Sequence, residues 1–403
     1  MTSVINKPYK RLQLFSGGGS RFGYYLGSYA ALVEHDLRPD IILGTCGGSL
    51  SAFLVQIAPD PKHLQQLACS HELYRVIKSI RHVDATEANL KLKLRYSAQA
   101  MQRWRWSRQF SSSKRQNQTD SYERLLDELQ QLAMFRVDNE AQWLDELLAF
   151  LSRENDEFKT NKPDIAIIAS RLQPSSNKIN AVNSAPQLQE LLFAPQRLLL
   201  ADSHLLEIPD NLTSPAHTFA NGRIAQSVKM ITEWDMATAV RASMADMFYL
   251  PPIHNADLGW CLGGVINLTP IELACQLADS VFAETKADYD SWLAAPAIQR
   301  IFGFDPNQRL AQVHGFLPST LYHNQDNSHN HSHNHSQNSN QLHWLPFADN
   351  GQQLIGSVQK RFSLKQMTVE LVHHNYDGFA QTMQAQWQYG YQRTADYIKQ
   401  HNL

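Results

Sequence analysis

Two strand–glycine turn–helix units in the first sixty residues restrict most strongly the folds open to this chain. Residues 11–16 (RLQLFS) predict a short strand, which ends in consecutive glycines and is followed by a helix that extends to Glu34. Residues 40–43 (DIIL) predict a second strand, which also ends at glycines and is followed by a helix over 49–57. Repetition of this unit is typical of an α/β fold with a mainly parallel sheet.

The remaining sequence predicts one large α/β domain with additions. We place this domain at 10–322, with a helical insertion at about 61–162 and a buried strand at 164–170 (DIAIIAS). A further helix is expected at 270–282. Residues 323–343, rich in His, Asn and Ser, predict a flexible linker or loop, because a tract with so few apolar side chains cannot form a core. The C-terminal segment 344–403 contains an amphipathic helix, expected at 377–399, that should pack on the main domain.

Composition and charge exclude several broad classes of protein. The formal net charge of −2 argues against a protein-wide attraction to nucleic acid. Four cysteines in 403 residues are too few for a disulfide scaffold and suit a reducing compartment. The first fifteen residues lack the apolar run of a secretory signal, and no apolar run in the chain is long enough for a spanning helix. We therefore expect a cytoplasmic protein, with peripheral membrane association as an option.

Three segments carry the residues from which a site could be built. The first is the glycine-rich turn at 17–23, whose backbone N–H groups can hold a phosphate or a developing oxyanion. The second, at 44–49 (GTCGGS), is a G-x-nucleophile-x-G elbow with Cys46 where serine is usual. The third comprises RASMAD (241–246), LPP (250–252) and LGGVIN (262–267). A dinucleotide-binding turn is the weaker interpretation of the first segment, because the acidic residue expected about twenty residues later is missing.

In this order and spacing the three segments resemble the patatin-like phospholipases. The resemblance implies a three-layer α/β/α sandwich that acts on ester bonds of membrane or neutral lipids and requires no cofactor or metal. It also assigns roles: the oxyanion hole to Gly17, Gly18, Gly19 and Arg21, the elbow to Gly44, Gly47 and Gly48, the nucleophile position to Cys46 and the dyad acid position to Leu262.

Both side chains of the dyad depart from the family pattern. Cys46 replaces the nucleophilic serine, Leu262 replaces the aspartate, and Phe22 takes the place of the last glycine in the first turn. Leucine cannot act as a base, so we expect ester hydrolysis to be weak or lost. The alternative function is a non-catalytic lipid-binding or regulatory protein.

The ionisation of Cys46 is left open by the sequence. A helix N-terminus lowers a thiol pKa, whereas apolar burial beside Leu262 raises it. Asp257 is a candidate substitute base, although a loop aspartate is more often an ordinary surface residue. A redox pair of Cys46 with Cys261 is a weaker idea, because buried unpaired thiols are commoner.

A second candidate surface lies in the insertion. Residues 88–119 contain no Asp or Glu, and they include the membrane-docking candidates Arg103, Trp104, Arg105, Trp106 and Arg108. Arginine and tryptophan on one helix suit an anionic lipid surface, and we rank this partner above single-stranded nucleic acid. A solvated helix with inward-facing tryptophans is equally consistent with the pattern. The expected partner is a lipid or a membrane surface, no specific nucleic acid is expected, and the sequence leaves the oligomeric state open.

Overall fold

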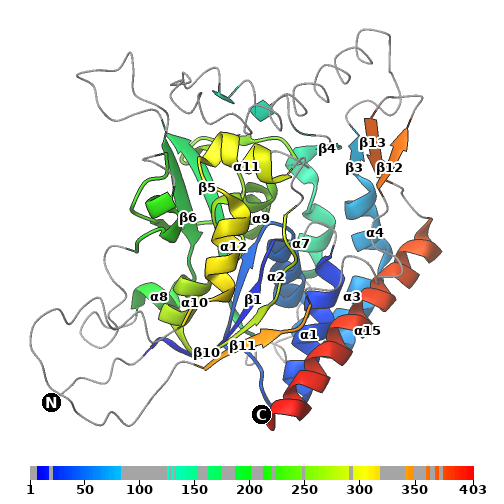
Figure 1. Ribbon diagram of the computed structural model, residues 1–403. Helices are drawn as coiled ribbons and strands as arrows, with labels where there is room; N and C mark the ends of the chain where they lie inside the picture. The colour runs from blue at the N-terminus through cyan, green and yellow to red at the C-terminus, as the bar shows by residue number, and fades with distance from the viewer. Residues whose placement is uncertain are drawn as a thin grey trace, which may run out of the picture.

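The structure is a computed structural model of the 403-residue chain (Figure 1). It describes residues 7–17, 21–82, 125–126, 129–130, 133, 135–151, 162–173, 187–200, 212–219, 223–246, 250–289, 294–317, 341–347, 360–363, 368–371 and 375–403.

A nine-stranded sheet forms the centre of the molecule. Its main path runs β11-β10-β1-β2-β5-β6-β7, and β9 pairs with both β5 and β8. The strands are β1 (Tyr9–Phe15), β2 (Ile41–Thr45), β5 (Asp164–Gln173), β6 (Gln187–Phe193), β7 (Lys229–Ile231), β8 (Ile253–Asn255), β9 (Gly259–Cys261), β10 (Ala278–Glu284) and β11 (Gln341–Leu345). The pairs from β11 to β5 are parallel, whereas β6 and β9 lie antiparallel to β5. The prediction of a mainly parallel sheet is therefore confirmed.

Helices surround this sheet (Figure 1). They are α1 (Phe22–Glu34), α2 (Gly47–Ile57), α3 (Pro61–Ala68), α4 (His71–Lys78), α7 (Asp145–Leu151), α8 (Arg197–Leu200), α9 (Met236–Met244), α10 (Ile271–Leu277), α11 (Ala294–Phe302), α12 (Pro306–His314) and α15 (Tyr376–His401). Short 3₁₀ turns occur at η1 (Glu140–Gln142), η3 (Pro215–Phe219) and η4 (Val265–Asn267). None of the helices in the described ranges is both long enough and apolar enough to cross a bilayer.

Apolar cores lie on both faces of the sheet, because successive side chains of a strand point to opposite sides. In β2, Ile42 belongs to the core formed with α1 and α2, whereas Ile41 and Leu43 belong to the core formed with α10. In β5, Ile167 and Ile168 divide between the two cores in the same way. Burial on both faces explains why these strands are apolar throughout, and it gives the α/β/α layering that the family resemblance implied.

Three sequence-based predictions need correction. The helix expected at 270–282 ends at Leu277, and the rest of that segment is β10, because its backbone pairs with both β1 and β11. The insertion at 61–162 is not purely helical, since β3 (Ile80–His82) pairs antiparallel with β4 (Phe135–Val137).

The expected linker at 323–343 ends earlier, because Gln341 begins the edge strand β11. Residues 318–340 lie outside the described ranges. A second small pair, β12 (Lys360–Ser363) with β13 (Thr368–Leu371), falls in the C-terminal segment.

The C-terminal helix α15 packs along α1, as Figure 1 shows in red and blue. The predicted helix at 377–399 is confirmed, and Phe379, Met383 and Trp387 are buried as expected. Tyr391, the fourth residue of the predicted apolar stripe, is only partly buried. The two helices approach closely at glycines: a Cβ added at Gly27 would lie 2.0 Å from the Trp387 carbonyl oxygen. In addition, the Gly23 N–H donates a 2.9 Å hydrogen bond to Gln386 Oε1. Through Gln386, α15 thus fixes the first turn of α1.

Replacing Gly27 with alanine should destabilise the protein. Alanine gains about 1 kcal/mol over glycine in a helix interior, but its Cβ would overlap backbone atoms of α15 that cannot turn aside. We expect a net loss of about 1–3 kcal/mol in the free energy of unfolding, the usual cost of overpacking. Urea unfolding measures it. The control is Gln381→Ala, at an exposed position of α15, which should change stability by less than about 0.5 kcal/mol. Equal midpoints for the two variants would contradict the described contact.

Candidate functional site

Cys46 lies at a sharp turn between the end of β2 and the start of α2. Its backbone has φ 53° and ψ −126°, a conformation that costs a non-glycine residue on the order of 1–3 kcal/mol. Gly48, two residues later, passes so close to β1 that an added Cβ would lie 1.9 Å from the Phe15 carbonyl oxygen. This combination is the geometry predicted for a nucleophile elbow, in which strain lifts one side chain out of the turn.

Hydrogen bonds from two elements hold this strained backbone. The Cys46 N–H donates to Ser243 Oγ at 2.8 Å, and Ser243 Oγ–H donates to the Ile168 carbonyl at 2.5 Å. On the other side, Ser49 Oγ–H donates to the Cys46 carbonyl at 2.6 Å. Ser243 belongs to α9 and to the RASMAD segment, so that segment supports the elbow directly. The sequence indicated the segment but not this contact.

An aspartate that the sequence analysis did not select lies against the thiol. Asp246 Oδ2 is 3.7 Å from Cys46 Sγ, within hydrogen-bonding range for sulfur. Its other oxygen, Oδ1, accepts a 3.4 Å bond from the Leu250 N–H. Asp246 is buried, 7% exposed, and follows the C-terminus of α9. Its place three residues after Ser243, in a segment already quoted, was the available signal.

The other residues named from the sequence provide no base and no disulfide partner for Cys46. Leu262 is fully buried in an apolar cluster, and its N–H donates to the Ser170 carbonyl. Asp257 is exposed in the turn between β8 and β9. Cys261 is buried, and all four cysteines are free, so no disulfide joins it to Cys46.

A buried ion pair positions the first residue of the glycine-rich turn. Glu284, at the end of β10, accepts a 2.6 Å bond from Ser16 Oγ and lies 2.8 Å from Lys286 Nζ. Lys286 Nζ also donates to the Gly17 carbonyl. Gly17 in turn lies beside the elbow, because an added Cβ would be 3.1 Å from the Cys46 Cβ. The sequence did not select Glu284 or Lys286, because this segment was assigned to the end of a helix and to the residues after it.

The rest of the predicted oxyanion loop is described only in part. Gly17 is buried and Arg21 is partly buried, directly before α1, where it contacts Tyr24 and Glu284 electrostatically. Gly18 and Gly19 lie outside the described residues. The docking candidates at 103–108 and most of the histidine tract also lie outside them, so those assignments stay predictions.

Burial controls the ionisation of Cys46. Desolvation is the largest effect and raises the pKa of the thiol well above its ordinary value, and the Asp246 carboxylate raises it further. The Gly47 N–H, at the start of α2, and the Lys286 ammonium act in the opposite direction but do not prevail. Of the two opposing effects that the sequence predicted for the pKa of Cys46, burial is therefore the larger, and the thiol is neutral.

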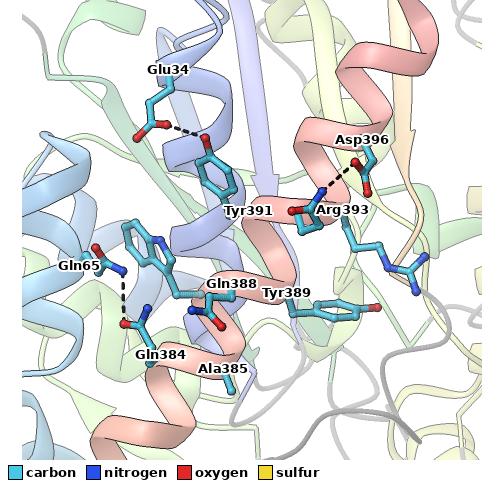
Figure 2. Close-up of a pocket in the computed structure, with 11 residues that line it drawn as sticks. Glu34, Gln65, Gln384, Ala385, Gln388, Tyr389, Tyr391, Arg393 and Asp396 are labelled. Atoms are coloured by element: carbon cyan, nitrogen blue, oxygen red, sulfur yellow. Dashed lines mark hydrogen bonds between the residues drawn. The ribbon is translucent and has the colours of Figure 1, made fainter.

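Two hollows of different kinds lie in the described part of the molecule. A cavity of about 20 Å³ is bordered by Leu268 and Tyr289. It has room for about one water molecule and not for an acyl chain. A groove of about 890 Å³ follows α15, where the Tyr391 hydroxyl donates to Glu34 at 2.6 Å (Figure 2). None of the described residues of the elbow or the glycine-rich turn lines this groove, so we treat it separately from the candidate site.

Comparison with known proteins agrees with this geometry. A family model described as patatin-like phospholipase matches residues 14–275. The chain belongs to the patatin-like phospholipase family. The matched region includes the glycine-rich turn, the elbow and the loop that contains Leu262. The resemblance inferred from the three motifs is confirmed.

Individual relatives of this patatin-like protein match over short stretches. A patatin-like phospholipase domain-containing protein of Pyricularia oryzae is 48% identical over 52 residues, which cover 13% of this chain and 7% of the relative. A second, from Aspergillus clavatus, is 41% identical over 73 residues, 18% of this chain and 10% of the relative. The chain therefore matches a tenth or less of the length of these relatives. Among solved structures, VipD from Legionella pneumophila aligns with 98% of this chain and 67% of its own, at 12% identity and a TM-score of 0.33.

Replacing Ser243 with alanine should destabilise the elbow. The change leaves the buried Cys46 N–H without the acceptor described above, at a cost of about 1–3 kcal/mol. Thermal or urea unfolding measures it. Ser51→Ala is the matched control, because Ser51 Oγ–H donates to the Phe22 carbonyl, which lies in the first turn of α1 and can still accept a helical hydrogen bond. A smaller loss for Ser243→Ala than for Ser51→Ala would contradict the supporting role of Ser243.

The Cys46 thiol should react slowly with alkylating reagents near neutral pH. Only the thiolate is nucleophilic, and its raised pKa keeps Cys46 protonated until the solution becomes strongly alkaline. Iodoacetamide labelling from pH 6 to 10, read by peptide mass spectrometry, should show Cys46 reacting far more slowly in the folded protein than in urea. The less buried Cys69 should react first. Rapid labelling of Cys46 at pH 7 would instead indicate a stabilised thiolate.

Proposed function

We propose that this patatin-like chain acts on the acyl ester bonds of membrane or neutral lipids through Cys46, with turnover slow compared with serine-containing members of its family. The observation that carries the proposal is the strained elbow, which presents the Cys46 side chain beside Gly17, the first residue of the glycine-rich turn. A nucleophile beside a turn whose backbone N–H groups can donate to an oxyanion is the arrangement that acyl transfer requires. The N–H of Gly17 itself donates to the Leu268 carbonyl, so we assign the donor role to the residues of the turn that follow it.

The weakness of the activity has a physical basis in the same site. The buried thiol keeps its proton, and the family's acid position is occupied by Leu262. Both changes reduce the supply of a competent nucleophile.

A non-catalytic lipid-binding role is the second candidate. It is favoured by the raised pKa of Cys46, because a thiol that keeps its proton near neutral pH is a poor nucleophile in a fold that could still hold a lipid. For both the slow hydrolase and the non-catalytic lipid-binding protein, we propose peripheral association with a membrane from the cytoplasmic side. The Arg/Trp segment at 103–108 is its proposed docking element, ahead of any contact with nucleic acid.

Intact-mass spectrometry after incubation with an ester tests the proposal. With p-nitrophenyl butyrate or a labelled phosphatidylcholine, the unaltered protein should gain the mass of one acyl group, and Cys46→Ala should gain none. The matched control is Cys261→Ala, which removes another buried thiol and should be acylated like the unaltered protein.

Two other outcomes would separate the candidate functions. Absence of any acyl adduct and of ester turnover, together with binding to phosphatidylcholine vesicles, would replace the proposal with the lipid-binding role. Acylation retained in Cys46→Ala would contradict the assignment of Cys46.

A further inference from the structure

Asp246 is the carboxylate that contacts the reacting sulfur. Its Oδ2 lies 3.7 Å from Cys46 Sγ, with the thiol as donor and the carboxylate as acceptor. We propose that Asp246 is the general base of this centre, in place of the family aspartate whose position is occupied here by Leu262. This inference rests on the proposed function, because it names the group that receives the proton when Cys46 attacks an ester.

The backbone around Asp246 is fixed from two sides. Ser243, one helical turn earlier, accepts the Cys46 N–H, so the same short segment contacts both the backbone and the sulfur of the nucleophile. Gly263 packs against the other side: its φ is +71°, and an added Cβ would lie 2.9 Å from the Asp246 Cα. The loop after Leu262 therefore supports a carboxylate that comes from α9.

The orientation of the carboxylate suits a base. Oδ1 accepts a bond from the Leu250 N–H at 3.4 Å, and Oδ2 is the oxygen that faces sulfur. The separation of 3.7 Å is long, but hydrogen bonds of catalytic groups commonly tighten only when substrate is bound.

Asp246 can accept and return the proton in both steps of ester hydrolysis. Asp246 takes the Sγ proton while sulfur bonds to the ester carbonyl carbon. The carbon–oxygen bond to the alcohol then breaks, and the alcohol leaves with the proton held by Asp246. Water next attacks the thioester and gives a proton to Asp246, the carbon–sulfur bond breaks, and the thiolate recovers that proton. The net change is ester plus water to fatty acid plus alcohol.

The surroundings of Cys46 make such a base necessary. The charged groups that act on its thiol are Asp246 after α9 and Lys286 after β10. Tyr289, also after β10, interacts with Cys46 but keeps its proton, because burial raises its pKa. Lys286 favours the thiolate but is paired with Glu284, and the balance with burial and Asp246 keeps the thiol protonated. Since a resting thiolate is disfavoured, attack on an ester depends on removal of the proton during the step itself.

Asp246→Asn tests the inference because two readouts should move in opposite directions. Acylation of Cys46 by p-nitrophenyl butyrate should slow by on the order of 10²-fold, the usual contribution of a general base. Alkylation by iodoacetamide should shift to lower pH, because removal of the negative charge lowers the pKa of the thiol. A merely structural role would slow or accelerate both reactions together.

Two further variants complete the test. Asp246→Glu retains a carboxylate and should recover part of the acylation rate lost in Asp246→Asn. The control is Asp257→Asn, which neutralises the exposed aspartate between β8 and β9 and should leave both rates unchanged. Thermal unfolding of each variant verifies that it is folded.

The outcomes separate this inference from the proposed function. If the unaltered protein is acylated at Cys46 and Asp246→Asn is acylated at the same rate, the assignment of Asp246 is wrong and the proposed function stands. If both reactions of Asp246→Asn change in the same direction, Asp246 has a structural role only. If the unaltered protein is never acylated, the proposed function fails and this inference fails with it.

Discussion

The candidate site depends on one strained backbone turn at Cys46. A positive φ at a residue with a side chain is unfavourable by itself, so neighbouring elements must hold it in place. Here Ser243 of α9 accepts the N–H of the strained residue, and Ser49 of α2 donates to its carbonyl. Gly48 lets α2 begin directly against β1. The contacts that hold the strained backbone of Cys46 thus also fix β2, α2 and α9 relative to one another.

The chemistry of the site is set by a competition between burial and charge. A thiol at the start of a helix, with an ammonium group nearby, would ordinarily ionise easily. In this protein, burial and the Asp246 carboxylate outweigh both influences, and the pKa of Cys46 rises. Lys286 has a second partner in Glu284, with which it fixes the carbonyl of Gly17. The ion pair consequently supports the position of the glycine-rich turn more than it stabilises a thiolate.

Local sequence signals predicted the parts of the fold that are close together along the chain. The turn at 44–48, the buried strand β5 and the apolar stripe on α15 all follow from residue type and spacing. β10 was missed because Val281 and Phe282 continue an apolar run that fits a helix equally well, and only pairing with β1 and β11 decides between them.

Only part of the candidate site could be predicted, because some of its residues are distant from one another in the sequence. The elbow is continuous in sequence, and its motif indicated Cys46 directly. Asp246 lies 200 positions away from Cys46. The local sequence around an aspartate at the end of a helix does not indicate which distant residue it will contact. Glu284 and Lys286 are likewise brought to Gly17 by sheet pairing, which no local pattern reports. Contacts that depend on tertiary packing could not be predicted from local sequence patterns.

The hydrogen bond between Gly23 and Gln386 has a consequence for synthesis of the chain. The two residues are 363 positions apart, and at 5–20 residues per second the ribosome needs roughly 20 to 70 seconds to span that interval. During this time the first turn of α1, next to the glycine-rich turn, lacks its partner on α15. The first turn of α1 therefore gains this partner only after the α15 segment has been synthesised, long after α1 itself.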